Sequence, residues 1–461
     1  MIIKLFSGTT GWNNIADPTR LKIDFETGIV ELAEALDVDI DDNGRISRRL
    51  GQGLIAVGEY HSLFCDGGDC FVILETVGDA AIYKVGTNNV LVGVRSGLTK
   101  NLRMGWCQTS LGTYYSNGVE SGYITAGVSY PWATQTYVGP PTTKTFGTPP
   151  LGTHLALFSS SMCVVNGTIV NYSEPLGYGL FDNARSRLRF ASNVKMFKPV
   201  DGGVWASDSK RTYFLEGSNI RELIRHPRLE CPAHEYSEAI GHINGADFGL
   251  SPDTGECAAW SCNDGLCIGT PQGQLIVVTK DKLNYQAGTR GATVFNGNTV
   301  INTIDDSVCI RTNLRGAASS KYQNYGFNSM VKFNGGLYGA KSDGLFQIVS
   351  GSTDNTTLIA STFTLPTTDL GSQNNKHLRF WYMGVKTDGK IQLDLTAEGK
   401  TTSTKSFRIS PPRNVHQVVR TPIGRNLYGR YWTPKISNVL GSDFSIDTNA
   451  VLPIIKSSGI S

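Results

Sequence analysis

An acidic stretch near the N-terminus has the spacing of a calcium-binding loop. In DVDIDDNGRISRR (37–49), the first, third, fifth and sixth positions of an EF-hand loop are filled by Asp39, Asp41, Asn43 and Gly44. The twelfth position should supply a bidentate glutamate, but it is Leu50. Positive charge also lies where the cation would sit, from Arg45, Arg48 and Arg49. A structural β-hairpin that turns at Asn43 and Gly44 therefore explains the stretch better than a calcium site.

Cysteine and histidine residues in the middle of the chain form a second candidate metal site. The potential zinc ligands are Cys231, His234, His242, Cys257, Cys262 and Cys267. Structural zinc sites usually pair their ligands in C-x2-C knuckles, and the last three cysteines do not have this spacing. Cysteines on strands often behave as small buried hydrophobic residues. We therefore predict neither a metal nor another cofactor.

Aromatic residues between positions 106 and 137 could form a platform for sugars. Trp106, Trp132 and Tyr137 belong to a loop-rich stretch that ends in GPPTTKTFGTPPLG (139–152). Paired prolines stiffen this connection and favour its exposure. The alternative is that the three rings pack between strands. We keep a surface-binding role for these residues as a prediction.

Local catalytic motifs are absent from the sequence. It contains neither the G-x-S-x-G elbow of hydrolases nor the H-E-x-x-H helix of zinc proteases. Any two of the 39 aspartate and glutamate residues could meet in space as a glycosidase pair. A propeller glycosidase is therefore retained as an alternative, but the prediction is that the protein is not an enzyme.

Short strands and tight turns must position all of these residues. Glycine accounts for 52 of 461 residues, well above the usual ~7%. Asn-Gly and Asp-Gly pairs, which favour hairpin turns, separate short apolar runs throughout the middle of the chain. Hairpins that return every 40–50 residues or so are typical of β-propellers. We predict an all-β protein with a β-propeller of six or seven blades, and a pair of stacked sandwiches is the competing fold.

Changes in composition divide the chain into four regions. A polar stretch rich in threonine and serine separates two regions of strand-like alternation. The predicted regions are an N-terminal arm and hairpin (1–50), the β-propeller (51–350), a linker (351–375) and a small C-terminal β-sandwich (376–461).

Charge and cysteine content limit the partners and the compartment. The net charge is +3, which is too small to indicate a surface that binds nucleic acid tightly. The N-terminus has no secretory apolar region, and no run approaches the ~20 apolar residues of a membrane span. The nine cysteines are scattered and odd in number, unlike a secreted disulfide framework. We expect the protein to be made and folded in a reducing cytoplasm.

The N-terminal run GWNNIADPTRLKIDFETGIVELAEALDVDIDDNGRISRRLGQ (11–52) resembles a group of virion proteins of tailed bacteriophages. The resemblance rests on Ala35, Val38, Asp39, Ile40, Asp41, Gly44, Arg45, Arg48, Arg49 and Gly51. The sequence departs from the group's pattern at Leu36-Asp37 and at Leu50. Looser similarity covers residues 172–184, 199–217, 260–275 and 429–455.

The resemblance is strongest to the tail nozzle, or packaged-DNA stabilisation, proteins of short-tailed phages. It implies a propeller that forms a cyclic homo-oligomer at the end of the tail, where it retains the genome and then lets it pass. The implied partners are other copies of the chain, other tail proteins (adaptor, tail fibre or spike), DNA without sequence-specific binding, and the host surface. The implied location is the virion tail, after assembly in the host cytoplasm. A tail-tip receptor that binds a glycan is the main alternative.

Overall fold

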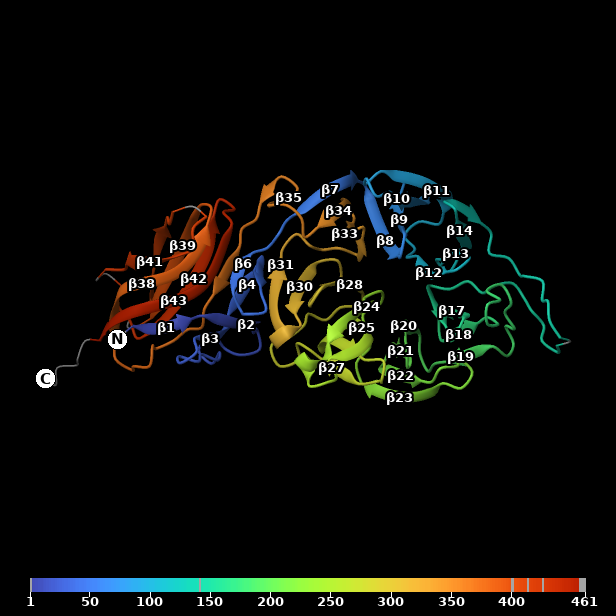
Figure 1. The fold of residues 1–461 in the computed structure, drawn as a ribbon, viewed down its shortest axis with the longest axis horizontal. Helices are drawn as coiled ribbons and strands as arrows, with labels where there is room; N and C mark the ends of the chain where they lie inside the picture. Colours follow the sequence, from blue (N-terminus) through green and yellow to red (C-terminus); the bar gives the residue numbers. More distant parts are fainter. Residues whose placement is uncertain (1, 141, 399–401, 413, 425–426, 456–461) are drawn as a thin grey trace.

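The computed structural model describes residues 2–140, 142–398, 402–412, 414–424 and 427–455. Almost all regular structure in this part of the chain is β-strand, and the helical segments are two short 3₁₀ turns, η1 (Gly245–Phe248) and η2 (Arg315–Ala317). No helix among the described residues is long and apolar enough to span a membrane. Figure 1 shows a ring of small sheets beside a compact β-sandwich.

Seven antiparallel sheets of four strands form the ring, five as separate sheets and two as the ends of larger ones. Blades 1 to 3 are β8 (Glu59–Asp66), β9 (Asp69–Glu75), β10 (Ala80–Val85), β11 (Leu91–Leu98); β12 (Gly105–Thr109), β13 (Gly112–Ser116), β14 (Ser121–Thr125), β15 (Val128–Tyr130); and β16 (His154–Phe158), β17 (Ser161–Asn166), β18 (Ile169–Tyr172), β19 (Arg187–Arg189). Blades 4 to 6 are β20 (Val194–Val200), β21 (Gly203–Asp208), β22 (Thr212–Glu216), β23 (Ile224–Leu229); β24 (Ala239–Asn244), β25 (Asp253–Cys262), β26 (Gly265–Gly269), β27 (Leu275–Val277); and β28 (Gly291–Asn296), β29 (Thr299–Ile304), β30 (Val308–Asn313), β31 (Ala318–Tyr322).

Blade 7 closes the ring with a strand from the beginning of the propeller region. Its first three strands are β32 (Ser329–Phe333), β33 (Gly336–Lys341) and β34 (Gly344–Ile348), and its outermost strand is β7 (Gln52–Val57). β7 pairs antiparallel with β34, from Gln52 opposite Ile348 to Val57 opposite Gly344. The chain is therefore a seven-bladed β-propeller with an attached β-sandwich, within the predicted range of six or seven blades.

Each interface between neighbouring blades has its own hydrophobic core. Seven such clusters follow one another around the ring, because each sheet packs one face on the blade before it and one on the blade after it. Between blades 4 and 5, for example, the rings of Trp205 and Trp260 lie 5.2 Å apart. The predicted turn chemistry is also present: Asn334 and Gly335, between β32 and β33, have φ of 47° and 76°, as a type I′ turn requires.

The β-sandwich combines strands from both ends of the chain. One sheet holds β41 (Gln417–Pro422), β38 (Lys376–Thr387), β43 (Phe444–Ile455), β6 (Ile46–Arg48) and β5 (Val38–Ile40), with β1 (Ile3–Phe6) also paired to β43. The other holds β4 (Glu34–Leu36), β37 (Thr362–Thr364), β42 (Tyr431–Val439), β39 (Lys390–Glu398) and β40 (Thr402–Ile409). Their shared core buries Trp381, Trp432 and Phe363 together with Phe6 and Ile40. The arm is thus built into the sandwich.

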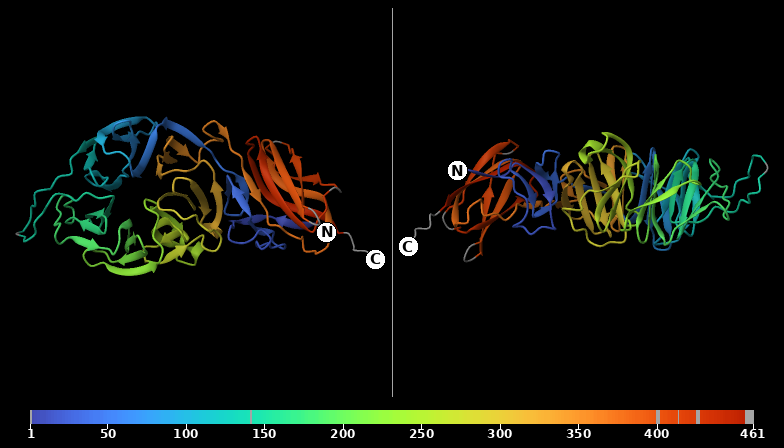
Figure 2. Two further views of the ribbon diagram at one scale, coloured as in Figure 1. Left: turned by 180° about the vertical axis from the view of Figure 1, so that it is seen from behind. Right: turned by 90° about the horizontal axis from the view of Figure 1, so that it is seen from below.

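The remaining strands connect the two bodies. β2 (Gly8–Trp12) and β3 (Ile29–Leu32) form a short parallel pair, and β35 (Thr353–Asp354) and β36 (Thr357–Leu358) extend the sheet of blade 7 beyond β7. β4 pairs with β31, so the sheet of blade 6 continues into the sandwich. Figure 2 shows the sandwich beside the rim of the propeller, while the β15–β16 connection projects from the opposite side.

Candidate functional site

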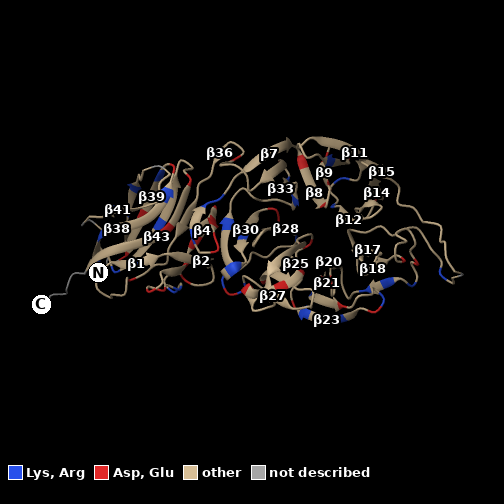
Figure 3. Ribbon diagram, in the orientation of Figure 1, with Lys and Arg blue, Asp and Glu red and all other residues tan. Residues whose placement is uncertain are grey.

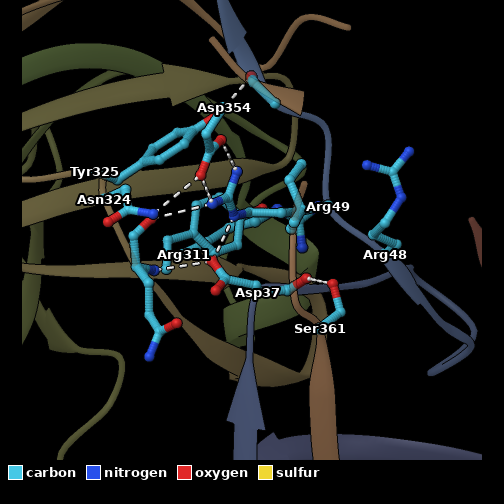
Figure 4. Close-up of polar contacts among 12 residues, drawn as sticks. Asp37, Arg48, Arg49, Arg311, Asn324, Tyr325, Asp354 and Ser361 are labelled. Atoms are coloured by element: carbon cyan, nitrogen blue, oxygen red, sulfur yellow. Dashed lines mark hydrogen bonds and ion pairs between the residues drawn. The ribbon is translucent and has the colours of Figure 1, made fainter. Parts of the chain in front are cut away.

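Arg49 lies at the point where the arm, the closure of the propeller and the sandwich meet (Figure 4). Its side chain is only 1% exposed. Nη1 and Nη2 donate to the two carboxylate oxygens of Asp354, at 2.8 and 2.6 Å, and Nε donates to Asp37 Oδ1 at 2.5 Å. The guanidinium also lies over the ring of Tyr325, 4.5 Å from its centroid. The planar guanidinium suits this site because it can donate hydrogen bonds to two carboxylates while it packs over an aromatic ring.

Asp37 extends the contacts of Arg49 to blade 6 and to the sandwich. Its Oδ1 accepts the backbone N–H of Gln323 at 2.9 Å, just after β31. Its backbone carbonyl accepts the hydroxyl of Ser361 at 2.6 Å, just before β37. Asp37 has φ of 53°, a left-handed conformation that aspartate tolerates better than most residues. This residue therefore fixes three segments that are far apart in the sequence.

The neighbouring carboxylates hold the Arg49 guanidinium in its charged form. Burial disfavours the charge of Arg49, but the hydrogen bonds that it donates to Asp354 and the charge of Asp37 outweigh burial and raise the pKa of the guanidinium. Burial raises the pKa of the Asp37 carboxyl more than the neighbouring Arg49 lowers it, so this pKa lies above its ordinary value. A buried ion pair of this kind contributes little net stability over an apolar replacement, but losing one partner is costly. The site therefore specifies one arrangement of the segments.

The arm forms a β-hairpin at the stretch with calcium-loop spacing. β5 and β6 pair antiparallel, and Asp41 Oδ1 accepts the N–H groups of Asn43 and Arg45, both at 2.9 Å. Gly44 has φ of 77°, and a Cβ there would lie 2.5 Å from the backbone nitrogen of Thr9. The carboxylates of this stretch are used by the protein itself: Asp39 accepts the hydroxyl of Tyr322 and lies 3.3 Å from Arg311 Nε, and Asp42 accepts the amide of Asn313.

Arg48 and Gly51 complete the junction, the set of contacts around Arg49 and Asp37 that joins the arm, the propeller and the sandwich. Arg48 Nη1 donates to the carbonyl of Ser352 at 2.7 Å, and its Nε lies 3.4 Å from Asp443 Oδ1 of the sandwich. A Cβ on Gly51 would lie 1.9 Å from the carbonyl oxygen of Thr353, so the two backbones approach as closely as only glycine allows. These contacts tie the sandwich to the closure of the propeller.

The six candidate zinc ligands do not form one site. Cys262 Sγ lies 3.5 Å from Cys267 Sγ, and both share the core between blades 4 and 5 with Cys231, whereas Cys257 packs between blades 5 and 6. No cluster of three or more potential metal ligands occurs among the described residues. His234 uses both ring nitrogens on Ser261 and Asn263, whereas His242 is exposed beside Glu256. The four cysteines are buried, and burial raises the pKa of the Cys257 thiol to about 11, which keeps it protonated at neutral pH.

The predicted aromatic platform has to be corrected, because two of its three residues are buried. Trp106 is 9% exposed, stacks on Phe71 between blades 1 and 2, and donates its indole N–H to the carbonyl of Ser62 at 2.8 Å. Trp132 is 8% exposed and donates to the carbonyl of Tyr178 at 2.9 Å, between blades 2 and 3. Tyr137 is 37% exposed, and its ring stacks on Phe146 in the projecting connection. The alternative, packing between strands, holds for both tryptophans.

Comparison with known proteins shows similarity to solved structures alone. The chain matches no protein-family model, and no curated protein is similar to it. Among solved structures it is similar to the computationally designed Ika8 protein (10% identity, TM-score 0.39, covering 65% of this chain and 98% of that one). It is also similar to the WD40 domain of coronin from Toxoplasma gondii (10% identity, TM-score 0.42, covering 68% and 88%). The strand pairing and the seven interblade cores carry the assignment to a propeller.

The residues of the junction could be found from the sequence only in part. Arg49 and Gly51 lie in the motif of the arm, but Asp354, which completes the fork, lies in a polar stretch that has the composition of a linker. Nothing in the local sequence around Asp37 indicates its contacts with Gln323 and Ser361. A partner that is 305 positions away leaves no trace in local spacing.

Proposed function

We propose that this protein is a structural component of a bacteriophage tail, in which copies of the chain form a nozzle-type ring that retains the genome and then lets it pass. The observation that carries the proposal concerns the arm. Several of the residues on which the resemblance to tail proteins rests help to build the junction, with Arg49 and Gly51 at its centre and Asp39 and Gly44 in its hairpin. The motif of the arm therefore lies in the segment that joins the propeller to the sandwich.

A building block of a ring has to present fixed surfaces at two ends. The continuous sheet from blade 6 through β4 into the sandwich, together with the Arg49 junction, joins the two bodies of this chain. The two ends of the chain's long dimension are the sandwich and the projecting β15–β16 connection (Figures 1 and 2). A cyclic assembly requires two different surfaces that meet head to tail, and these opposite ends are suited to that role.

The charge distribution suits a wall past which DNA slides. Figure 3 shows lysine and arginine interspersed with aspartate and glutamate over the propeller and the sandwich. With a net charge of +3, a ring of such subunits would make few net phosphate contacts. Because each phosphate contact adds to affinity, a strongly basic wall would hold the genome back.

Protein analysis of virions tests this proposal. Particles of the phage whose genome encodes this chain are purified on a density gradient and analysed by quantitative mass spectrometry. We expect the chain to co-purify with the capsid proteins in several copies per particle, in constant ratio to the portal protein. Absence of the chain from infectious particles, or a single copy per particle, would overturn the proposal.

A further inference from the structure

A polar pocket of about 780 Å³ opens among the loops of blades 1, 6 and 7. Its lining comes from connections between blades, such as Arg103 and Asn328, and from turns within blades, such as Asp306 and Asp343. Since neighbouring strands are antiparallel, these two kinds of loop emerge on the same face of the ring. The volume is in the range of small-molecule sites, roughly 300–1,000 Å³.

Glu75 is the most deeply placed acid of this pocket. Its side chain is 2% exposed. Oε1 lies 2.9 Å from His61 Nε2 and accepts the backbone N–H of Asn101 at 2.8 Å. Oε2 is buried and has no hydrogen-bond partner among the described residues. Because buried polar atoms are normally paired, this oxygen is suited to accept a hydrogen bond from a group outside the chain.

Asp306 provides a second acceptor of the same kind. Its Oδ1 is buried without a hydrogen-bond partner in the described chain, and Arg103 Nη2, at 3.9 Å, is beyond hydrogen-bond distance. Arg103 is already engaged, since its two terminal nitrogens donate to Asn328 at 3.0 and 2.9 Å. Arg290 lies 3.4 Å from Asp306 Oδ2, and its side chain is 54% exposed, so it has N–H groups free for a ligand.

The charges around the pocket restrict the class of ligand. Glu59, Glu75, Asp306 and Asp343 line it and disfavour an anion. Arg103, Arg290 and Lys341 line it as well and disfavour a cation. Two unpaired acceptors beside a free donor suit a molecule whose groups both donate and accept hydrogen bonds, as hydroxyl groups do.

We propose that this pocket binds an uncharged, hydroxyl-rich ligand of the size of a mono- or disaccharide. Glu75 and Asp306 accept hydrogen bonds from its hydroxyl groups, and Arg290 donates to its oxygens. Such a site goes beyond a role in the tail ring. It also lies elsewhere than the aromatic stretch that the sequence indicated for sugar binding.

Binding measurements on the full chain test the site. Saturation-transfer NMR is run with glucose, galactose and N-acetylglucosamine, with glucosamine as a cationic probe and glucuronic acid as an anionic probe, and a glycan array covers surface-bound saccharides. We expect at least one uncharged saccharide to bind, and its charged analogues to bind at least about fivefold more weakly. Asp306→Asn and Arg290→Ala should each weaken that binding about tenfold.

The control is Glu216→Gln, which changes an exposed acid on blade 4 that lies outside the pocket and should leave binding within about twofold. Arg290→Ala removes a half-exposed side chain, so it keeps the test decisive if Asp306→Asn fails to fold. The inference is overturned if no uncharged saccharide binds in solution or on the array, if glucuronic acid or glucosamine is preferred, or if both pocket variants bind like the control. None of these results depends on whether the chain is found in virions.

Discussion

Arg49 and Asp354, 305 positions apart, form a two-pronged ion pair with N–O distances of 2.8 and 2.6 Å. The pair ties the end of the hairpin of the arm to the strand that follows the last blade. β7 begins three residues after Arg49 and closes the ring, and β35, which contains Asp354, pairs with β7. The ion pair therefore fixes both the closure of the propeller and the position of the sandwich.

Replacing Arg49 by alanine should destabilise the junction strongly. The variant leaves Asp37 and Asp354 as buried carboxylates without a cation, which typically costs about 3–5 kcal/mol. The measurement is the free energy of unfolding in urea, followed by tryptophan fluorescence. The matched control is Arg45→Ala, since Arg45 is half-exposed and 4.0 Å from Asp447, and it should change stability by less than about 1 kcal/mol. Equal effects of the two variants would show that the Arg49 fork has no special role.

Gly51 and Gly53 should differ sharply in their tolerance of a methyl group. In Gly51→Ala the new Cβ would lie 1.9 Å from the carbonyl oxygen of Thr353, so the backbones at the ring closure must separate. We expect a loss of about 1–3 kcal/mol. A Cβ on Gly53 meets no atom within 4 Å, so Gly53→Ala should stay within about 0.5 kcal/mol of the natural protein. Thermal unfolding of the two variants side by side decides the point, and similar melting temperatures would contradict it.

Calcium should not stabilise the hairpin of the arm. Asp41 caps its own turn, and Asp39 is engaged by Tyr322 and Arg311, so these carboxylates are not free to coordinate a cation. A ligand that binds the folded state raises its melting temperature by mass action. We therefore expect the same melting temperature, within about 1 °C, in 5 mM or so of CaCl₂ and in EDTA. A clear rise with calcium that disappears in Asp39→Asn would contradict this assignment.

Stability should fall in mildly acidic solution because of His61. Burial lowers the pKa of His61 from 6.5 to about 4, and Arg103 adds to this effect while Glu75 opposes it. The unfolded chain therefore binds more protons than the folded one between about pH 6.5 and pH 4, and stability decreases as the pH falls through that range. The loss attributable to His61 is at most about 3 kcal/mol. His61→Gln should show a flatter pH profile than His226→Gln, which alters a partly exposed histidine. Identical profiles would argue against this origin.

Local chemistry made the fold class accessible from the sequence. Asn-Gly and Asp-Gly turns, such as the one at Asn334-Gly335, set the strand pattern of a propeller. The contacts of Arg49 and the burial of Trp106 were not accessible, because they depend on which blades and strands become neighbours. Trp106 lies in a stretch rich in loops, yet the packing of blade 2 on blade 1 covers its ring. Short-range residue patterns therefore predict turns well, but they do not predict interfaces between segments that are distant in the sequence.

Cryo-electron microscopy of the intact phage particle tests the central proposal most directly. We predict that the tail contains a ring of identical subunits around its axis, into each of which the seven-bladed propeller and its sandwich fit as one body, in the orientation set by Arg49 and Asp354. A tail in which no density accommodates a seven-bladed propeller, or one with a single off-axis copy, would contradict the proposed role.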